Sequence, residues 1–325
     1  MIPIFTPATA RKDVNKVPGD GELAKLANLN RLVENVNTIV ANGIPAAAPT
    51  LTYSNTGTLD SMYVNFNIKV PTGATYNSGG TKTVQSYYVP NVYLNNSPAL
   101  TSITFPDVIL FNELFVEGNG SLLDSLTSIS LPVTTQMGYI KLTALPSLTT
   151  FNVPSLVNAS QITIQYSTSL TSINFSNIIT LDYGFEITDL EEVTSINFDS
   201  LQYIAGQYMV IRYCNSLTSF SLPEIIRINV SDEFSIRNND NLTSLTLGTI
   251  GTLESLPVVN AEGNALDAAS VNGILALLVS LDGTGNRDLF QANVYLAGGT
   301  NAAPTGQGII DKQTLIDRGC NVETN

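Results

Sequence analysis

Apolar and polar positions along residues 93–265 recur in one phrase, which reads L-T-S-I-T-F-P where it first occurs. Near the end of each phrase, two apolar residues are separated by a single Ser, Thr or Asn, an alternation typical of a short, half-buried β-strand. Successive phrases begin 22 to 26 residues apart. Seven phrases begin in this way, at Leu100, Leu126, Leu148, Leu170, Val193, Leu217 and Leu242.

A second pair of apolar residues precedes each phrase after the first. These pairs are Leu114/Val116, Ile140/Leu142, Ile162/Ile164, Phe185/Ile187, Val210 with Ile211, and Phe234/Ile236. A turn containing Asn or another small residue joins pair to phrase, and we expect its Asn side chains to bind backbone amides in Asx-type hydrogen bonds. Each repeat is therefore predicted to hold two short strands, and neither can bury its apolar face alone. Stacked repeats, about 4.8 Å apart, would bury both, so we predict a mainly β fold.

The pattern L-x-I-x-x-N-x-x-L-T-S-I-x-L-P-x-L resembles the leucine-rich repeats of solenoid proteins on bacterial surfaces and in phages. A period of 22 to 26 residues falls within the range of roughly 20–29 residues known for such repeats. The resemblance implies a leucine-rich-repeat-like β-solenoid over residues 93–265. Helix-forming runs are missing between the phrases, so both sides of the repeat are expected to be β-rich. The resemblance indicates architecture and leaves function open.

Residues 266–325 depart from the repeat and predict an α/β cap. A helix is expected from about Asp267, its N-cap, to Leu281, and a second helix from Ile309 to Asp317. A last strand is expected at 321–324. A stacked array needs such a cap, because its final repeat otherwise exposes core and strand edge. The first helix would bury a stripe of four residues, Val271, Ile274, Leu275 and Leu278.

Part of this cap carries a second resemblance. The run L-A-G-G-T-N-A-A-P-T-G-Q-G, a following helix and the closing R-G-C-N-V resemble a C-terminal module that recurs in phage and prophage structural proteins. The resemblance implies a viral origin and a place in the virion, in the head or in the tail.

The segments before the repeats predict an attachment region. Residues 1–19 contain several prolines and no periodicity, which indicates an extended anchoring arm. Residues 20–44 predict a helix capped by Asp20, and residues 50–92 a small β element that caps the repeats. The helix either packs on its own chain or joins other copies in a short coiled coil. The linker-like stretch after the helix favours the coiled coil. Its heptad stripe consists of Leu26, Leu29, Val33, Val36 and Val40.

Composition and charge narrow the function. The chain has 325 residues, 14 basic and 27 acidic, with a net charge of −13 and no His. Catalysis or metal binding through His is therefore excluded, and an acidic chain is a poor binder of nucleic acid. No apolar run is long enough to span a membrane, and the first residues lack a signal-peptide pattern. Cys214 and Cys320 are expected to be free thiols.

The basic side chains are concentrated at the start. Residues 1–31 hold five basic and three acidic residues, a net charge of +2, which leaves −15 for the remainder. We expect Arg11, Lys12 and Lys16 to anchor the chain on an acidic partner surface. A solvated tail is the alternative interpretation.

The acidic cluster of Asp182, Glu186, Asp189, Glu191 and Glu192 is the main candidate for chemistry. Paired carboxylates cleave glycans in some tailspike enzymes, and an oxygen-rich site of this kind could hold Ca²⁺. A charged turn facing solvent is the favoured interpretation, and no calcium-loop motif is present. The candidate ligand face consists of Asp182, Glu186, Tyr203 and Tyr208. No catalytic residue, cofactor or metal is predicted.

Taken together, these features predict a structural protein of a phage virion, assembled in the host cytoplasm. We expect a head or tail fibre or decoration protein, a homotrimer formed through the helix and docked on other virion proteins through the arm. The repeats would adhere to a host-surface glycan, and neither nucleic acid nor a membrane is an expected partner. Two alternatives remain, a glycan-cleaving tailspike enzyme and a bacterial surface adhesin with leucine-rich repeats.

Overall fold

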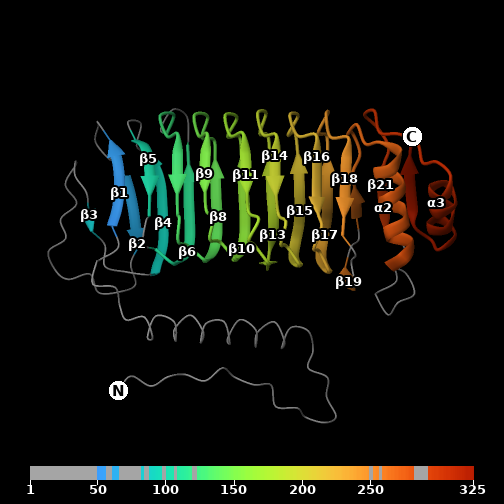
Figure 1. Ribbon diagram of the computed structural model, residues 1–325, viewed down its shortest axis with the longest axis horizontal. Helices are drawn as coiled ribbons and strands as arrows, with labels where there is room; N and C mark the ends of the chain where they lie inside the picture. The colour runs from blue at the N-terminus through green and yellow to red at the C-terminus, as the bar shows by residue number, and fades with distance from the viewer. Residues whose placement is uncertain are drawn as a thin grey trace, which may run out of the picture. The chain divides into compact units, whose positions relative to one another are not determined.

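The computed structural model describes residues 50–55, 61–65, 82–83, 88–96, 100–105, 108–118, 123–248, 252–255, 258–281 and 292–325. The described residues all belong to one compact unit, Pro49–Asn325. The predicted arm at 1–19 and helix at 20–44 fall outside the described residues. The described part is mainly β with parallel sheets and carries two helices, so the predicted β-rich class is confirmed (Figure 1).

One large sheet, the long sheet, takes one strand or strand pair from each repeat. Its neighbouring strands pair in parallel from β4 onward, in the order β4-β6-β8-β10-β12/β13-β15-β17-β19/β20. Stacking of successive repeats therefore places equivalent positions side by side. The strands are β4 (Tyr88–Asn96), β6 (Leu110–Glu117), β8 (Gln136–Thr143), β10 (Asn158–Gln165), β12 (Thr180–Leu181), β13 (Gly184–Thr188), β15 (Tyr203–Arg212), β17 (Arg227–Arg237), β19 (Thr252–Ser255) and β20 (Val258–Asn260).

The repeat phrases form a second row of short strands on the other side of the core. They pair in parallel as β5-β7-β9, β11-β14 and β16-β18. Both sides of the repeat are thus β-strands, as predicted from the missing helical runs. The short strands are β5 (Leu100–Thr104), β7 (Ser128–Ser130), β9 (Thr150–Asn152), β11 (Ser172–Asn174), β14 (Ser195–Asn197), β16 (Ser219–Leu222) and β18 (Ser244–Leu247).

Three strands precede the repeats and pair antiparallel. β1 (Thr50–Asn55) pairs with β5 and with β3 (Lys82–Thr83), and β2 (Ser61–Asn65) pairs with β4. Both rows of repeat strands therefore begin against an antiparallel neighbour. These strands fall within the small β element predicted at 50–92, and its other residues, apart from the start of β4, lie outside the described residues.

The core lies between the two rows of strands and is built from ladders of like residues. Ile140, Ile162, Phe185 and Met209 occupy successive rungs, and each is fully buried. Apolar side chains removed from water in this way are the main stabilising contribution to such a fold. Every repeat therefore depends on its neighbours for burial.

The pairing of β13 with β15 corrects one of the apolar pairs that we predicted from the sequence. We predicted Val210 with Ile211 as the core-facing pair of β15, but the residues opposite Phe185 and Ile187 of β13 are Met209 and Ile211. Side chains alternate along a strand, so Val210 points to the opposite face from the core ladder. The irregular register between Gly206 and Tyr208 obscures this phase in the sequence.

Left-handed backbone marks the same turn in successive repeats. Ala144, Tyr166, Asp189, Tyr213 and Asn238 have φ between 53° and 57°. Non-glycine residues rarely adopt this conformation, which costs them roughly 1–2 kcal/mol each. The residue after each is buried and holds the turn: Leu145, Ser167, Leu190, Cys214 and Asn239.

The buried Asn side chains of these turns bind across repeats rather than locally. Oδ1 of Asn239 accepts the N–H of Cys214 in the preceding repeat (3.0 Å), and its Nδ2 donates to the carbonyls of Ile211 (3.3 Å) and Arg237 (3.1 Å). Asn264 and Asn301 repeat the arrangement. The expected Asx-type bonding is therefore wrong for Asn239, which lies in a turn between pair and phrase, because the backbone groups it satisfies are largely those of the preceding repeat.

The C-terminal segment contains both predicted helices. Helix α2 (Ala268–Leu281) begins after Asp267, whose Oδ1 accepts the N–H of Ser270 at 2.7 Å. Helix α3 (Gln307–Asp317) begins two residues before its predicted start. Strands β21 (Asn293–Leu296) and β22 (Asn321–Thr324) extend the long sheet in parallel beyond β20, which confirms the predicted last strand. The predicted stripe of α2 is buried: Val271, Ile274, Leu275 and Leu278.

Candidate functional site

The outer face of the long sheet is the surface that points away from the core ladders. Its residues are those that alternate with the core positions, such as Tyr208 and Arg212 around Met209 and Ile211 in β15. Parallel in-register pairing continues this alternation from strand to strand. The outer face therefore carries rows of side chains that run across the repeats.

An aromatic strip begins this face. The rings of Tyr93 and Phe115 stack with centroids 4.9 Å apart, and Phe115 meets Tyr139 edge to face at 5.0 Å. The hydroxyl of Tyr93 donates a hydrogen bond to the Glu113 carboxylate, and this bond raises the pKa of Tyr93. Three successive strands thus contribute contacting rings to one surface.

Hydrogen bonds continue the row of outer-face contacts from β8 across β10 to β15. The hydroxyls of Tyr139 and Thr163 lie 3.1 Å apart, and Nε2 of Gln161 donates to the hydroxyl of Tyr208 at 3.0 Å. Burial, followed by the charge of Glu186, raises the pKa of Tyr208. We call Tyr93, Phe115, Tyr139 and Tyr208 the aromatic strip.

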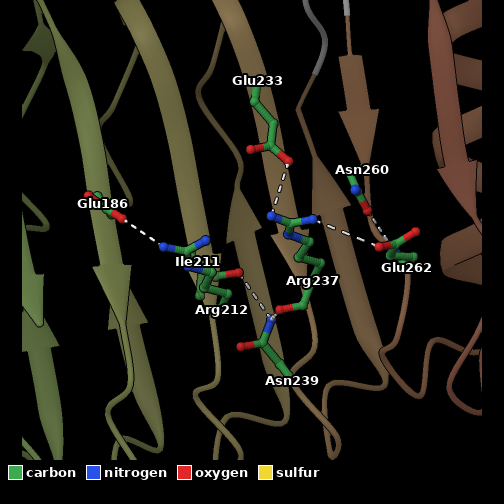
Figure 2. Close-up of polar contacts among 8 residues, drawn as sticks. All are labelled: Glu186, Ile211, Arg212, Glu233, Arg237, Asn239, Asn260 and Glu262. Atoms are coloured by element: carbon green, nitrogen blue, oxygen red, sulfur yellow. Dashed lines mark hydrogen bonds and ion pairs between the residues drawn. The ribbon is translucent and has the colours of Figure 1, made fainter. Parts of the chain in front are cut away.

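Beside the end of this strip lies a row of ion pairs. Arg212 Nη2 lies 3.2 Å from Glu186 Oε1, and Arg237 lies 3.8 Å from both Glu233 and Glu262 (Figure 2). We call these five residues the ionic row. Their side chains are 20 to 42 % exposed, so they are partly desolvated and still open to solvent. Arg212 and Arg237 are register neighbours on β15 and β17, so the row presents two guanidinium donors together with the carboxylates that pair with them.

Several polar atoms in this region lack a partner. The hydroxyls of Thr188 and Ser235 and the Nε atoms of Arg212 and Arg237 are buried and have no hydrogen-bond partner among the described residues. All four groups belong to outer-face positions of β13, β15 and β17. Buried polar groups are usually paired, and these four unpaired groups lie in the ionic row or on the strands that carry it.

The structure brings together half of the predicted ligand face. On the outer face, Glu186 of β13 pairs with Val210 of β15, and Tyr208 lies two residues before Val210, diagonally across from Glu186. Tyr203 lies at the start of β15, with its ring 5.0 Å from the Arg227 guanidinium. Asp182 lies in the bend between β12 and β13.

Sequence reasoning missed the partners of Glu186 and Tyr208. Arg212 lies on β15, as Tyr208 does, whereas Gln161 and Tyr139 come from β10 and β8. The alternation of apolar and polar residues in the long-sheet strand of each repeat indicates which residues lie on the outer face. Which of them meet depends on the register between repeats.

The acidic cluster does not converge. Glu186 lies on the outer face, whereas Asp189 occupies the left-handed turn and Glu191 and Glu192 are exposed in the next turn. Among the described residues, no group of three or more His, Cys, Asp or Glu side chains could hold a metal ion. This arrangement fits the favoured interpretation of charged turns.

Both cysteines are buried, free thiols, as expected. Cys214 takes the turn position that Asn239 fills in the next repeat, and its Sγ lies 3.6 Å from the Arg212 carbonyl, to which it donates. Burial raises the pKa of this thiol to about 12. The thiol therefore remains protonated near neutral pH and is a poor nucleophile.

The residues predicted for attachment lie outside the described residues, namely Arg11, Lys12 and Lys16 for anchoring, and Leu26, Leu29, Val33, Val36 and Val40 for oligomerisation. Within the described parts of the chain, no helix is long and apolar enough to cross a membrane.

Comparison with known proteins identifies no relative of this chain. No protein-family model, no curated protein and no solved structure matches this chain.

Proposed function

We propose that the chain is a β-solenoid of the leucine-rich-repeat type that serves as a structural, surface-adhesive protein of a phage particle, as a head or tail fibre or decoration. The observation that carries this proposal is the in-register stacking of the repeats, which joins one strand or strand pair from each repeat into one continuous outer face. Repeat arrays of this kind commonly serve as extended binding surfaces. The particle setting draws its support from the phage-like pattern of the C-terminal segment.

Adhesion explains the outer face better than hydrolysis does. Glycoside hydrolysis requires one carboxylic acid and one available carboxylate on either side of the substrate bond. On this face, Glu186 is engaged by Arg212, while Glu233 and Glu262 share Arg237. Glu113 accepts the hydroxyl of Tyr93. Carboxylates held in such pairs suit recognition of a ligand rather than proton transfer.

Attachment to the particle is assigned to residues 1–44. The basic start of the chain would dock on an acidic surface of another virion protein, and the stripe of the helix at 20–44 would gather three copies. To test docking, Arg11, Lys12 and Lys16 would all be changed to Glu, and particles from host lysates would be purified on density gradients. Mass spectrometry should find the unchanged protein in the particle band and the variant in the soluble fraction. Absence of the unchanged protein from particles would refute the proposal.

The oligomeric state is tested separately by sedimentation of the full chain. Val33→Asp places a charge on the heptad stripe, whereas Asn35→Asp places the same charge beside it. We expect a trimer for the unchanged protein and for Asn35→Asp, and a monomer for Val33→Asp. Equal behaviour of the two variants would show that the stripe does not hold copies together.

A further inference from the structure

We propose that the outer face between β6 and β20 binds a neutral polysaccharide, with the polymer lying across the strands. The inference rests on the proposed adhesive function and adds its ligand class. It rests on the aromatic strip, on the exposed donors and acceptors of the ionic row and on the charge of the chain.

The aromatic strip suits the apolar faces of sugar rings. A pyranose ring presents several C–H bonds on one face, and the negative π-face of an aromatic ring attracts them. Phe115 and Tyr139 contact each other on neighbouring strands, and Tyr208 follows further along the sheet, on β15. The hydroxyls of the two tyrosines bind Thr163 and Gln161, which fixes these rings before any ligand arrives. Such pre-organisation lowers the entropic cost of binding.

The ionic row suits hydroxyl groups. Each hydroxyl of a sugar both donates and accepts, so it can donate to Glu186 while accepting from Arg212. The five side chains of the ionic row are 20 to 42 % exposed, so their carboxylates and guanidinium groups are within reach of a ligand rich in hydroxyl groups.

Charge selects a neutral ligand over an acidic one. The ionic row holds three carboxylates and two guanidinium groups, and the whole chain carries −13. Each guanidinium already faces at least one carboxylate, so a sulfated or uronic polymer would compete with Glu186, Glu233 and Glu262 and meet an overall repulsive field. A neutral polymer avoids both costs.

The length of the outer face favours a polymer over a single sugar as the ligand. Neighbouring strands lie about 4.8 Å apart, so the strip and the row together extend over several strands, on the order of 30 Å. A longer chain can contact the aromatic strip and the ionic row at once. We therefore expect affinity to rise with the length of the oligosaccharide.

The test uses the full chain in native gels that contain dextran, galactomannan, mixed-linkage β-glucan, heparin or hyaluronan. At least one of the three neutral polymers should retard the protein, and oligosaccharides of that polymer should bind more tightly as they lengthen. Retardation by the acidic polymers alone, or by none of the five, would overturn the inference. Particle association is measured independently, so its loss would refute the proposed function without touching this result.

Two tyrosine variants localise binding to the face. Tyr139→Ala removes a ring from the aromatic strip, whereas Tyr166→Ala removes an exposed ring from a turn. With circular dichroism unchanged, Tyr139→Ala should raise the dissociation constant for the retarding polymer at least tenfold, and Tyr166→Ala should change it less than twofold. Tyr139→Phe keeps the ring and should retain most of the affinity. Similar losses in Tyr139→Ala and Tyr166→Ala would place binding elsewhere and overturn the assignment.

Discussion

At the scale of single residues, the buried turn position decides how one repeat is joined to the next. Leu, Ser, Cys and Asn all occupy it, and the Asn residues provide the most hydrogen bonds between repeats. The buried amide of Asn239 makes three hydrogen bonds to backbone groups, so replacing this one side chain tests its role directly.

Replacing Asn239 with Ala should destabilise the fold by roughly 3 kcal/mol. The change leaves the N–H of Cys214 and the carbonyls of Ile211 and Arg237 without this partner in a buried site, and each such group costs about 1–3 kcal/mol. Asn241→Ala is the matched control, because its amide is exposed and donates one bond, to Asn215. Denaturant unfolding should show a loss below about 1 kcal/mol for the control. Equal losses would contradict the assignment.

The left-handed turn residues carry conformational strain that glycine can relieve. Ala144 has φ 55°, so Ala144→Gly should raise the free energy of unfolding by up to about 1 kcal/mol. Ala205 lies in β15 and is not among the residues with positive φ, so Ala205→Gly should lower stability by about 0.5–1 kcal/mol. Thermal unfolding of both variants measures the contrast. Destabilisation by Ala144→Gly would argue against strain at this turn.

Cys214 should make stability fall in alkaline solution. Its pKa is raised by burial from 9.0 to about 12, so the folded chain holds this proton more tightly than the unfolded chain does. The resulting stabilisation is complete below pH 9 and is lost as the pH rises from 9 towards 12. Cys214→Ser removes this titration, and Ser167 fills the same position in another repeat. The difference in unfolding free energy between the two proteins should therefore shrink between pH 8 and pH 10.5, and a constant difference would exclude the linkage.

At the scale of elements, capping of α2 joins the terminal segment to the last repeat. Asp267 accepts the N–H of Ser270 through its side chain, while its own N–H donates to the Thr243 carbonyl. The cap residue is therefore tied to both the helix and the repeat phrase beside it.

Asp267→Ala should cost about 1 kcal/mol of stability, the usual effect of losing an N-cap. The pKa of Asp267 is lowered, chiefly by the backbone N–H of Ser270, so its contribution is present above pH 3.8 and is lost as the pH falls through the lower folded value. Asp267→Asn keeps an acceptor and does not titrate. Unfolding at pH 6 and pH 2.5 should show an acid-induced loss in the unchanged protein that is smaller in Asp267→Asn.

Helices and strands that are specified by residues close together in the chain were predictable from the sequence. Helix α2, strand β22 and the strands of the repeat phrases follow from periodicity and capping residues that lie within a few positions of one another. The phase of β15 was not predictable, because Val210, Met209 and Ile211 are all apolar and only pairing with β13 assigns them to faces.

At the scale of the whole molecule, stacking implies that repeats are interchangeable units. Deleting residues 170–192 removes one complete repeat and joins Ser169 to Val193, which begins the next phrase. We expect this variant to remain folded, with lower stability and the strand content of the remaining repeats. Deleting residues 170–181 instead removes the phrase and leaves β13 unmatched, so that variant should unfold. Circular dichroism with denaturant unfolding compares the two, and loss of folding in both would argue against modular stacking.

The sequence alone determined the local features of this chain: the period of the repeats, the alternation within each phrase, the turns and the helices of the terminal segment. These depend on side chains a few residues apart, whose spacing is set by backbone geometry. Only the tertiary structure decided which outer-face residues meet. Glu186 and Arg212 lie 26 residues apart, and Gln161 and Tyr208 lie 47 apart. Contacts at that distance depend on the register between strands, and a shift of one residue would turn every one of these side chains to the other face of the sheet.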